Sequence, residues 1–236
     1  MAMWKDKLNI ITSMVSYNLK IIFANKFIYF MIAAIAFYLL VTTIMLFSDF
    51  TPMPENVYGS LIFPGLLIIF YPVLFSVQND KDSRMLEIVF SIPNYRYKIY
   101  LVRFVISLLL LFVVLTLMTM FSSFALVKVP LFYMVYQVMF PLLFMACLSF
   151  LFATLVKNAS GAAVIMIIFG LFFWIMNEPL RSNKWNVFLN PFFVPTEISY
   201  NIWLNIILQN RIILVVGSLI SFLWALINLQ HREKFV

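Results

Sequence analysis

Side chains able to bind a partner gather in one segment, Gln78–Lys98, where charges interrupt an otherwise apolar chain. Asp82 or Ser83 can cap a short helix over Arg84–Phe90, because short polar side chains accept hydrogen bonds from the first turn of a helix. Within it, Arg84 and Glu87 are three residues apart and can pair.

The same short helix carries apolar groups that could anchor in a groove of another protein, namely Leu86, Ile88 and Val89. Ser91 and Pro93 then end it, and Pro93 suits the first turn of a following helix that includes Arg96. These residues predict a docking segment. An ordinary interfacial connector is an equally good interpretation of the same residues.

Residues for metal binding, redox chemistry or nucleotide hydrolysis are scarce. Cys147 is the only cysteine and His231 the only histidine, so a disulfide, a thiolate metal site and a bis-histidine haem site are excluded. The chain has no Gly-x-x-x-x-Gly-Lys-[Ser/Thr] loop. We therefore expect no catalytic residues, no metal and no bound cofactor, and no ATP hydrolysis by this chain alone.

The composition places these residues in a membrane protein. Hydrophobic residues make up 64% of the 236 residues, charged residues only 11%, and the mean hydropathy is +1.03. A helix needs roughly 20 apolar residues to cross about 30 Å of hydrocarbon. Stretches that reach or approach this length predict an all-α fold with six transmembrane helices, at Phe27–Phe47, Gly59–Val77, Ile99–Val127, Phe132–Val156, Gly161–Met176 and Ile212–Leu229.

None of the six predicted spans contains Asp or Glu. Ion-driven transporters and proton pumps usually carry carboxylates or histidines at depth. If this protein moves a substrate, the energy is therefore expected to come from another subunit.

The basic residues predict the orientation. With both termini in the cytoplasm, twelve Lys and Arg residues fall on the cytoplasmic side and four (Lys128, Arg181, Lys184 and Arg211) on the outer side. The net charge of +7 is thus a topology signal. It does not favour nucleic-acid binding, because no basic cluster with interleaved aromatics forms a domain outside the membrane.

Residues 1–26 precede the first span and predict an amphipathic helix lying in the membrane interface. A simple continuation of the first span is the alternative. The apolar positions recur at helical spacing, as Trp4, Leu8, Ile11, Val15, Leu19 and Ile22.

The outer segment Asn177–Arg211 is too apolar for a plain loop. Asn190-Pro191 and Pro195 interrupt it. Because irregular backbone is not tolerated in contact with lipid, we expect short helical pieces, broken at the prolines and partly sunk in the outer leaflet.

The order of residues around the charged segment resembles that of ABC-2 type transporter permeases, the membrane subunits of type V ABC exporters. Those proteins carry an acidic-basic stretch, then Leu-Glu, then Ser-x-Pro-x-x-Arg and a further basic residue. This chain departs from the pattern at Arg84-Met85, where the family usually has Gly-Thr, and at Val102, where glycine is common. The matching residues are Asp80, Lys81, Asp82, Leu86, Glu87, Ser91, Pro93, Arg96 and Arg103.

The resemblance implies an organisation for the whole chain. Residues 1–26 would form the interfacial helix and 27–236 the six-helix transmembrane domain, with a coupling loop at 78–98 and an external re-entrant segment at 177–211. Partners would be cytoplasmic ATPase subunits, which bind ATP and Mg²⁺, and a second permease, as a homodimer or heterodimer in the lipid of a bacterial inner membrane.

In the resembling family, the second and fifth spans of two subunits line a central path. Each residue carried over to this path could equally be an ordinary lipid-facing or interhelical residue. They are Phe63, Leu67, Phe70, Tyr71, Leu74, Val164, Ile168, Phe172 and Phe173.

The sequence thus predicts the transmembrane permease subunit of an ATP-driven exporter of an amphipathic or lipid-like substrate. The alternatives are a non-transporting assembly or receptor-like membrane protein, an intramembrane enzyme, and a haem-export-type permease.

Overall fold

The computed structural model describes residues 26–48, 51–75, 96–156 and 158–230. Within these ranges the chain forms helices and turns, and no strand. The helices are α2 (Phe27–Phe47), α3 (Pro54–Leu74), α6 (Arg96–Ala125), α7 (Leu131–Leu155), α8 (Ala159–Asn177) and α9 (Tyr200–Gln230). The expected interfacial helix of residues 1–26 and the coupling helix Arg84–Phe90 lie outside the described residues, apart from Lys26 at the start of α2.

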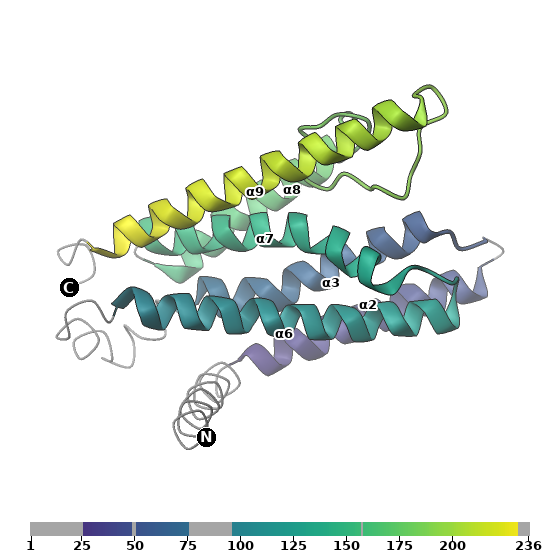
Figure 1. Cartoon of the computed structure of the whole chain (residues 1–236). Coiled ribbons are helices and arrows are strands. Elements are labelled where there is room, and N and C mark those ends of the chain that lie inside the picture. The colour runs from purple at the N-terminus through teal and green to yellow at the C-terminus, as the bar shows by residue number, and fades with distance from the viewer. Residues whose placement is uncertain (1–25, 49–50, 76–95, 157, 231–236) are drawn as a thin grey trace, which may run out of the picture.

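All six described helices are long and apolar enough to cross a membrane, so the chain is an integral membrane protein with an all-α fold. The helices alternate in direction, and the start of α2 and the end of α9 lie toward the same end of the bundle (Figure 1). We call this end the terminal end. The opposite end, which holds the start of α3 and the connections 126–130 and 178–199, is the loop end.

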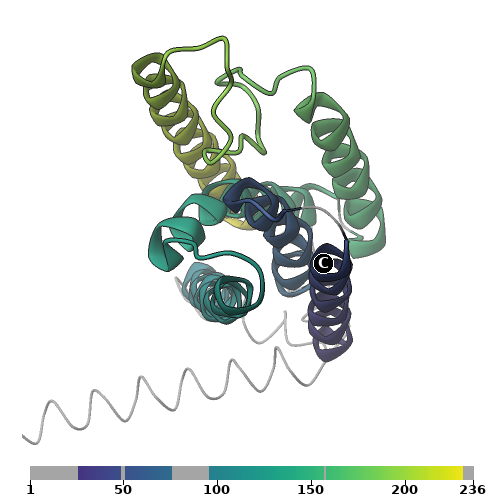
Figure 2. The ribbon, with the colours of Figure 1, turned by 90° about the vertical axis from the view of Figure 1, so that its right-hand side faces the viewer.

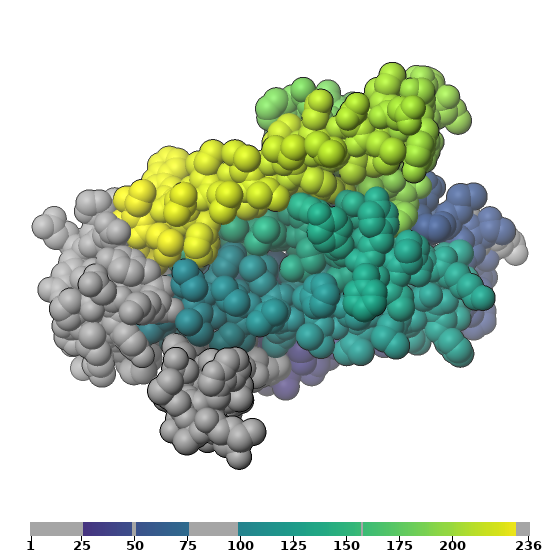
Figure 3. Space-filling model, in the orientation of Figure 1, coloured from purple at the N-terminus to yellow at the C-terminus, as the bar shows by residue number. Residues whose placement is uncertain are grey.

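Two helices form the centre of the bundle. In their most apolar stretches, 67% of α3 and 61% of α7 is buried, against 17% of α2 and of α8. Helix α7 packs against α3, α6, α8 and α9, whereas α3 packs against α2, α6 and α7. Figure 2 shows α8 and α9 on different sides of this centre, and Figure 3 shows α9 along the surface of the molecule.

Small residues let the central helices approach closely. A Cβ atom at Gly65 of α3 would collide with the Leu142 side chain of α7. At Gly217 of α9, a Cβ atom would lie 2.8 Å from the ring of Phe144 in α7. Close packing through small residues is the expected mode of association between helices in lipid, where the hydrophobic effect does not drive helices together.

Hydrogen bonds from hydroxyl groups also join helices. Tyr38 of α2 donates to the Met118 carbonyl oxygen of α6 and pairs with the Ser122 hydroxyl. All three residues are buried. This contact fixes α2, which has few buried residues of its own, to the side of α6.

The main difference from the predicted spans is the start of the last helix. Helix α9 begins at Tyr200, not at Ile212, and passes through Asn210 and Arg211 without a break. These polar residues were expected to lie in the external segment. They do not end the helix because their side chains are hydrogen-bonded inside the protein, as described below.

The segment between α8 and α9 also differs from expectation. Residues 178–199 form turns, bends and stretches without regular secondary structure, and the expected short helical pieces do not occur there. The only helix within 177–211, apart from Asn177 at the end of α8, is the beginning of α9. Segment 178–199 is nevertheless packed, since Val187, Phe188 and Leu189 are buried.

Candidate functional site

The predicted coupling residues fall almost entirely outside the described residues. Arg96 is the first residue of α6. Arg103 lies two turns further on and is buried, with its Cζ atom 5.9 Å from the centre of the Tyr100 ring. The chain leaves α3 and returns in α6 at the terminal end (Figure 1). The other predicted coupling residues, Asp82, Arg84, Leu86, Glu87, Ile88, Val89, Ser91 and Pro93, remain untested by the structure.

The predicted path residues of α3 mostly pack against other helices of the same chain. Leu74 is fully buried and Tyr71 is 6% exposed. The Tyr71 ring packs against Phe30 of α2 and against Phe75, each with ring centroids 4.9 Å apart. Phe63 is 41% exposed, and the centroid of its ring lies 4.6 Å from that of Phe37 in α2. Leu67 and Phe70 are partly buried against the core.

The predicted path residues of α8 face outward instead. Val164, Ile168 and Phe172 are each more than half exposed, and Phe173 packs toward Phe144 of α7 with ring centroids 6.3 Å apart. Helices α3 and α8 touch only slightly. Within one chain, the predicted path residues of α3 and those of α8 therefore do not line a shared path. A path between two chains stays a prediction.

A buried arginine organises the loop end. Arg211 of α9 is 7% exposed. Its Nε donates to Gln137 Oε1 of α7 at 2.8 Å and its Nη1 to Asn210 Oδ1 at 2.9 Å. Its Nη2 donates to the Leu189 carbonyl oxygen at 3.2 Å. These acceptors are neutral, so the buried charge is stabilised by dipoles rather than by a carboxylate.

Asparagine side chains extend this network into segment 178–199. Asn210 Nδ2 donates to the carbonyl oxygens of Lys184 at 2.9 Å and Asn186 at 2.7 Å. Asn186 Nδ2 in turn donates to Asn177 Oδ1 at 2.9 Å, at the end of α8. The turns between α8 and α9 are thereby tied to both helices.

The same segment is tied to α3. Tyr58 donates its hydroxyl proton to the Leu189 carbonyl oxygen at 3.0 Å. Asn190 Nδ2 donates to the backbone carbonyl oxygen of Glu55 at 2.9 Å. Segment 178–199 is therefore a fixed cap over the loop end, held by α3, α7, α8 and α9.

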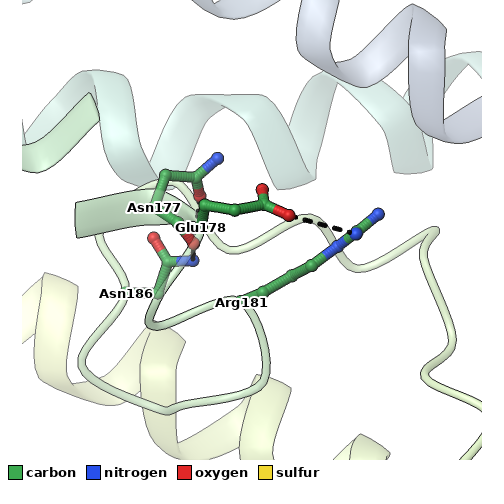
Figure 4. A network of polar contacts seen from close by, with 4 residues as sticks. All are labelled: Asn177, Glu178, Arg181 and Asn186. Carbon is green, nitrogen blue, oxygen red and sulfur yellow. Dashed lines mark hydrogen bonds and ion pairs between the residues drawn. The ribbon is translucent and has the colours of Figure 1, made fainter. Parts of the chain in front are cut away.

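A polar pocket of about 220 Å³ opens between this cap and α3. Arg181 in its wall pairs with Glu178 at 3.4 Å and places its Cζ atom 3.7 Å from the centre of the Phe193 ring. Figure 4 shows Glu178 reaching toward Arg181, with Asn177 and Asn186 side by side. The lining residues are Glu55, Asn56, Asn177, Glu178, Arg181, Asn186, Asn190 and Phe193.

The lining limits the chemistry of this pocket. It holds carboxylates, amides and one guanidinium, and it has no serine, cysteine or histidine that could act as nucleophile or base. Among the described residues, no group of three or more His, Cys, Asp or Glu side chains could hold a metal ion. The pocket is suited to binding rather than to catalysis.

This pocket was not among the sites predicted from the sequence. Asn183, Asn186 and Asn190 each accept a hydrogen bond from the backbone N–H two residues further on, which is the asparagine turn that such residues favour. Their close spacing predicts turns, and this signal could have identified the cap. The contacts to Gln137 and Glu55 are long-range and leave no local signal.

Comparison of the chain with models of protein families, with curated proteins and with solved structures finds no match.

Proposed function

We propose that this chain is the membrane permease subunit of an ATP-driven exporter, and that a separate ATPase subunit binds ATP and Mg²⁺ and hydrolyses the nucleotide. The observation that carries the proposal is where the charged segment joins the bundle. Gln78–Lys98 connects α3 to α6 at the terminal end. It follows directly on α3, the described span with the largest buried share.

That connection gives a docked partner a mechanical route into the bundle. A force on the segment acts on the last turn of α3, where Leu74 is fully buried and Tyr71 nearly so. Since α3 packs against α2, α6 and α7, its displacement would disturb three other spans. A closely packed interior transmits such strain because it has few voids to absorb it.

The distribution of charges supports an external energy source. Glu55 is the only acidic residue in the six described helices, and it lies in the first turn of α3. Arg103 lies two turns inside α6. Arg211 lies three turns inside α9, and an arginine stays protonated and does not act as a proton carrier. Proton- or ion-coupled transport normally needs titratable groups deep in the membrane.

The exposed side of α8 fits a second permease subunit. Its outward residues, including Val164, Ile168 and Phe172, form an apolar surface that lipid or an identical or related chain can cover. A path with such lining would suit an amphipathic or lipid-like substrate. In this proposal both termini lie in the cytoplasm of a bacterial cell and the chain resides in the inner membrane.

Copurification tests the proposal. Leu86→Asp places a charge in the proposed apolar contact, and Glu87→Lys reverses the charge that sets its register. Both should reduce copurification of an ATPase and stimulation of its activity, Glu87→Lys by about 1–3 kcal/mol of binding free energy. Glu197→Lys, an equal charge change in the exposed part of the cap, is the control and should leave both unchanged.

Expression and membrane insertion should be normal in all three variants, since none of the altered residues lies within a described span. Full retention of ATPase binding and activity by both Leu86→Asp and Glu87→Lys would contradict the proposal. An ATPase that binds but drives no substrate movement in reconstituted vesicles would instead favour a non-transporting assembly protein.

A further inference from the structure

The pocket at the loop end holds a carboxylate that no described residue neutralises. The Glu55 side chain has no ion-pair partner among the described residues, and Asn190 binds the backbone carbonyl oxygen of Glu55 rather than its carboxylate. The amide groups of Asn186 and Asn190 already donate within the protein.

The charge of the lining points the same way. Glu178 is neutralised by Arg181, so Glu55 leaves the pocket with an excess of one negative charge. An anionic ligand would compete with Glu178 for Arg181 and would be repelled by the unpaired carboxylate. A ligand that is a cation and a hydrogen-bond donor satisfies that carboxylate.

We infer that this pocket binds a primary ammonium group, with Glu55 as its counter-ion. An ammonium group brings three N–H donors and no acceptor, which suits the carboxylate oxygens that the lining leaves without a partner. A metal ion is a poorer fit, since the lining has one unpaired carboxylate and the described residues hold no larger cluster of acidic or histidine ligands.

The pocket should distinguish a primary ammonium from a quaternary one. A quaternary group cannot donate hydrogen bonds and is usually held by open aromatic faces. The aromatic ring in this pocket, Phe193, is already covered by the Arg181 guanidinium. A volume of about 220 Å³ admits a small amine or the headgroup of a lipid that carries one.

This inference does not rest on the proposed ATPase partner, since the pocket lies at the loop end, away from the segment that joins α3 to α6 (Figure 1). Failure of ATPase binding would leave it standing.

Calorimetric titration of the purified full chain in detergent tests it. Ethanolamine and choline are compared as soluble probes, and short-chain phosphatidylethanolamine and phosphatidylcholine as lipid probes. We expect saturable binding of at least one ethanolamine-bearing probe, and at least about tenfold weaker binding of its choline-bearing counterpart, because the charge-assisted hydrogen bonds are lost.

Two substitutions and a control localise the site. Glu55→Gln keeps the backbone bond to Asn190 and removes the charge, so binding should fall by about tenfold or more. Asn56→Asp adds a second unpaired carboxylate to the pocket lining and should strengthen binding several-fold, which misfolding cannot imitate. Glu197→Gln, exposed and outside the pocket lining, should not change it.

Binding of ethanolamine itself supports a soluble amine as ligand, and binding of the lipid alone supports a headgroup. Equal binding of the choline-bearing probes, no binding of any probe, or affinities unchanged in both Glu55→Gln and Asn56→Asp would overturn the inference.

Discussion

Replacing Arg211 with methionine should destabilise the protein by removing the centre of the loop-end network. Arg211 gives one hydrogen bond each to Gln137, Asn210 and the Leu189 carbonyl oxygen, at 2.8, 2.9 and 3.2 Å. The Leu189 oxygen still receives the Tyr58 hydroxyl at 3.0 Å, so two acceptors lose a partner.

The magnitude follows from these two orphaned groups. Gln137 and Asn210 are 4% and 1% exposed, and a buried acceptor without a partner costs roughly 1–3 kcal/mol. Removing the buried charge recovers part of its desolvation penalty, which leaves a loss of about 2–4 kcal/mol. For a protein of this size, 1 kcal/mol corresponds to about 2–4 °C in Tm, so a fall of roughly 5–15 °C is expected.

Thermal unfolding in detergent, followed by tryptophan fluorescence at a fixed heating rate, is the assay. Arg181→Met is the matched control, because it removes the same group from an ion pair whose side chains are 49% and 78% exposed. Exposed pairs contribute only about 0–1 kcal/mol. Gln137→Met with Arg211→Met should cost less than the sum of the single changes, since each replacement orphans the other residue.

The reasoning would be refuted if Arg211→Met lowered Tm no more than Arg181→Met, or if the costs of Gln137→Met and Arg211→Met simply added. Either result would mean that water or another group satisfies the network without the guanidinium.

Two further predictions concern packing and topology. Gly65→Ala should lower Tm because its new methyl group collides with a side chain of α7. Gly59→Ala, with nothing within 4 Å of its Cβ position, is the control and should not lower Tm. Equal effects of the two substitutions would contradict close α3–α7 packing. In a protein whose native cysteine has been replaced, new cysteines at Thr51 and Asn183, exposed at the loop end, should react with an impermeant reagent added to intact cells. A cysteine at Ser160, exposed near the terminal end, should react only after lysis. The reverse pattern would invert the predicted orientation.

The number and course of the spans could be predicted because lipid imposes a length and an apolar composition on every crossing helix. The first predicted span, Phe27–Phe47, is identical to α2. The next four spans shift by a few residues where polar ends are tolerated, as at Pro54 of α3, where proline suits the first turn of a helix.

The last span could not be delimited in this way. Arg211 has the character of a residue outside the membrane, yet it lies inside α9 because α7 and segment 178–199 supply its acceptors. That pairing joins positions 74 and 22 residues apart, and no local pattern encodes it. The pocket was missed for the same reason, since Glu55 and Asn56 meet Asn177 and Asn190 only after the bundle has formed.

Helix α3 links the two ends on which the proposals depend. Its first turn carries Glu55 and Asn56 of the ammonium pocket, and its last turn leads into the proposed coupling segment. With 21 residues it spans roughly 30 Å. Pro64 and Pro72 lie inside it, and each removes a backbone N–H that would hold the preceding turn. A helix that is buried along most of its length, yet weakened at two positions, can bend where its neighbours allow and still move as a unit elsewhere. In an ATP-driven exporter, an ammonium ligand bound at the loop end and an ATPase docked at the terminal end would therefore act on the same helix. Glu55→Gln should then leave ATPase docking intact but change how an ammonium ligand affects the stimulation of ATPase activity.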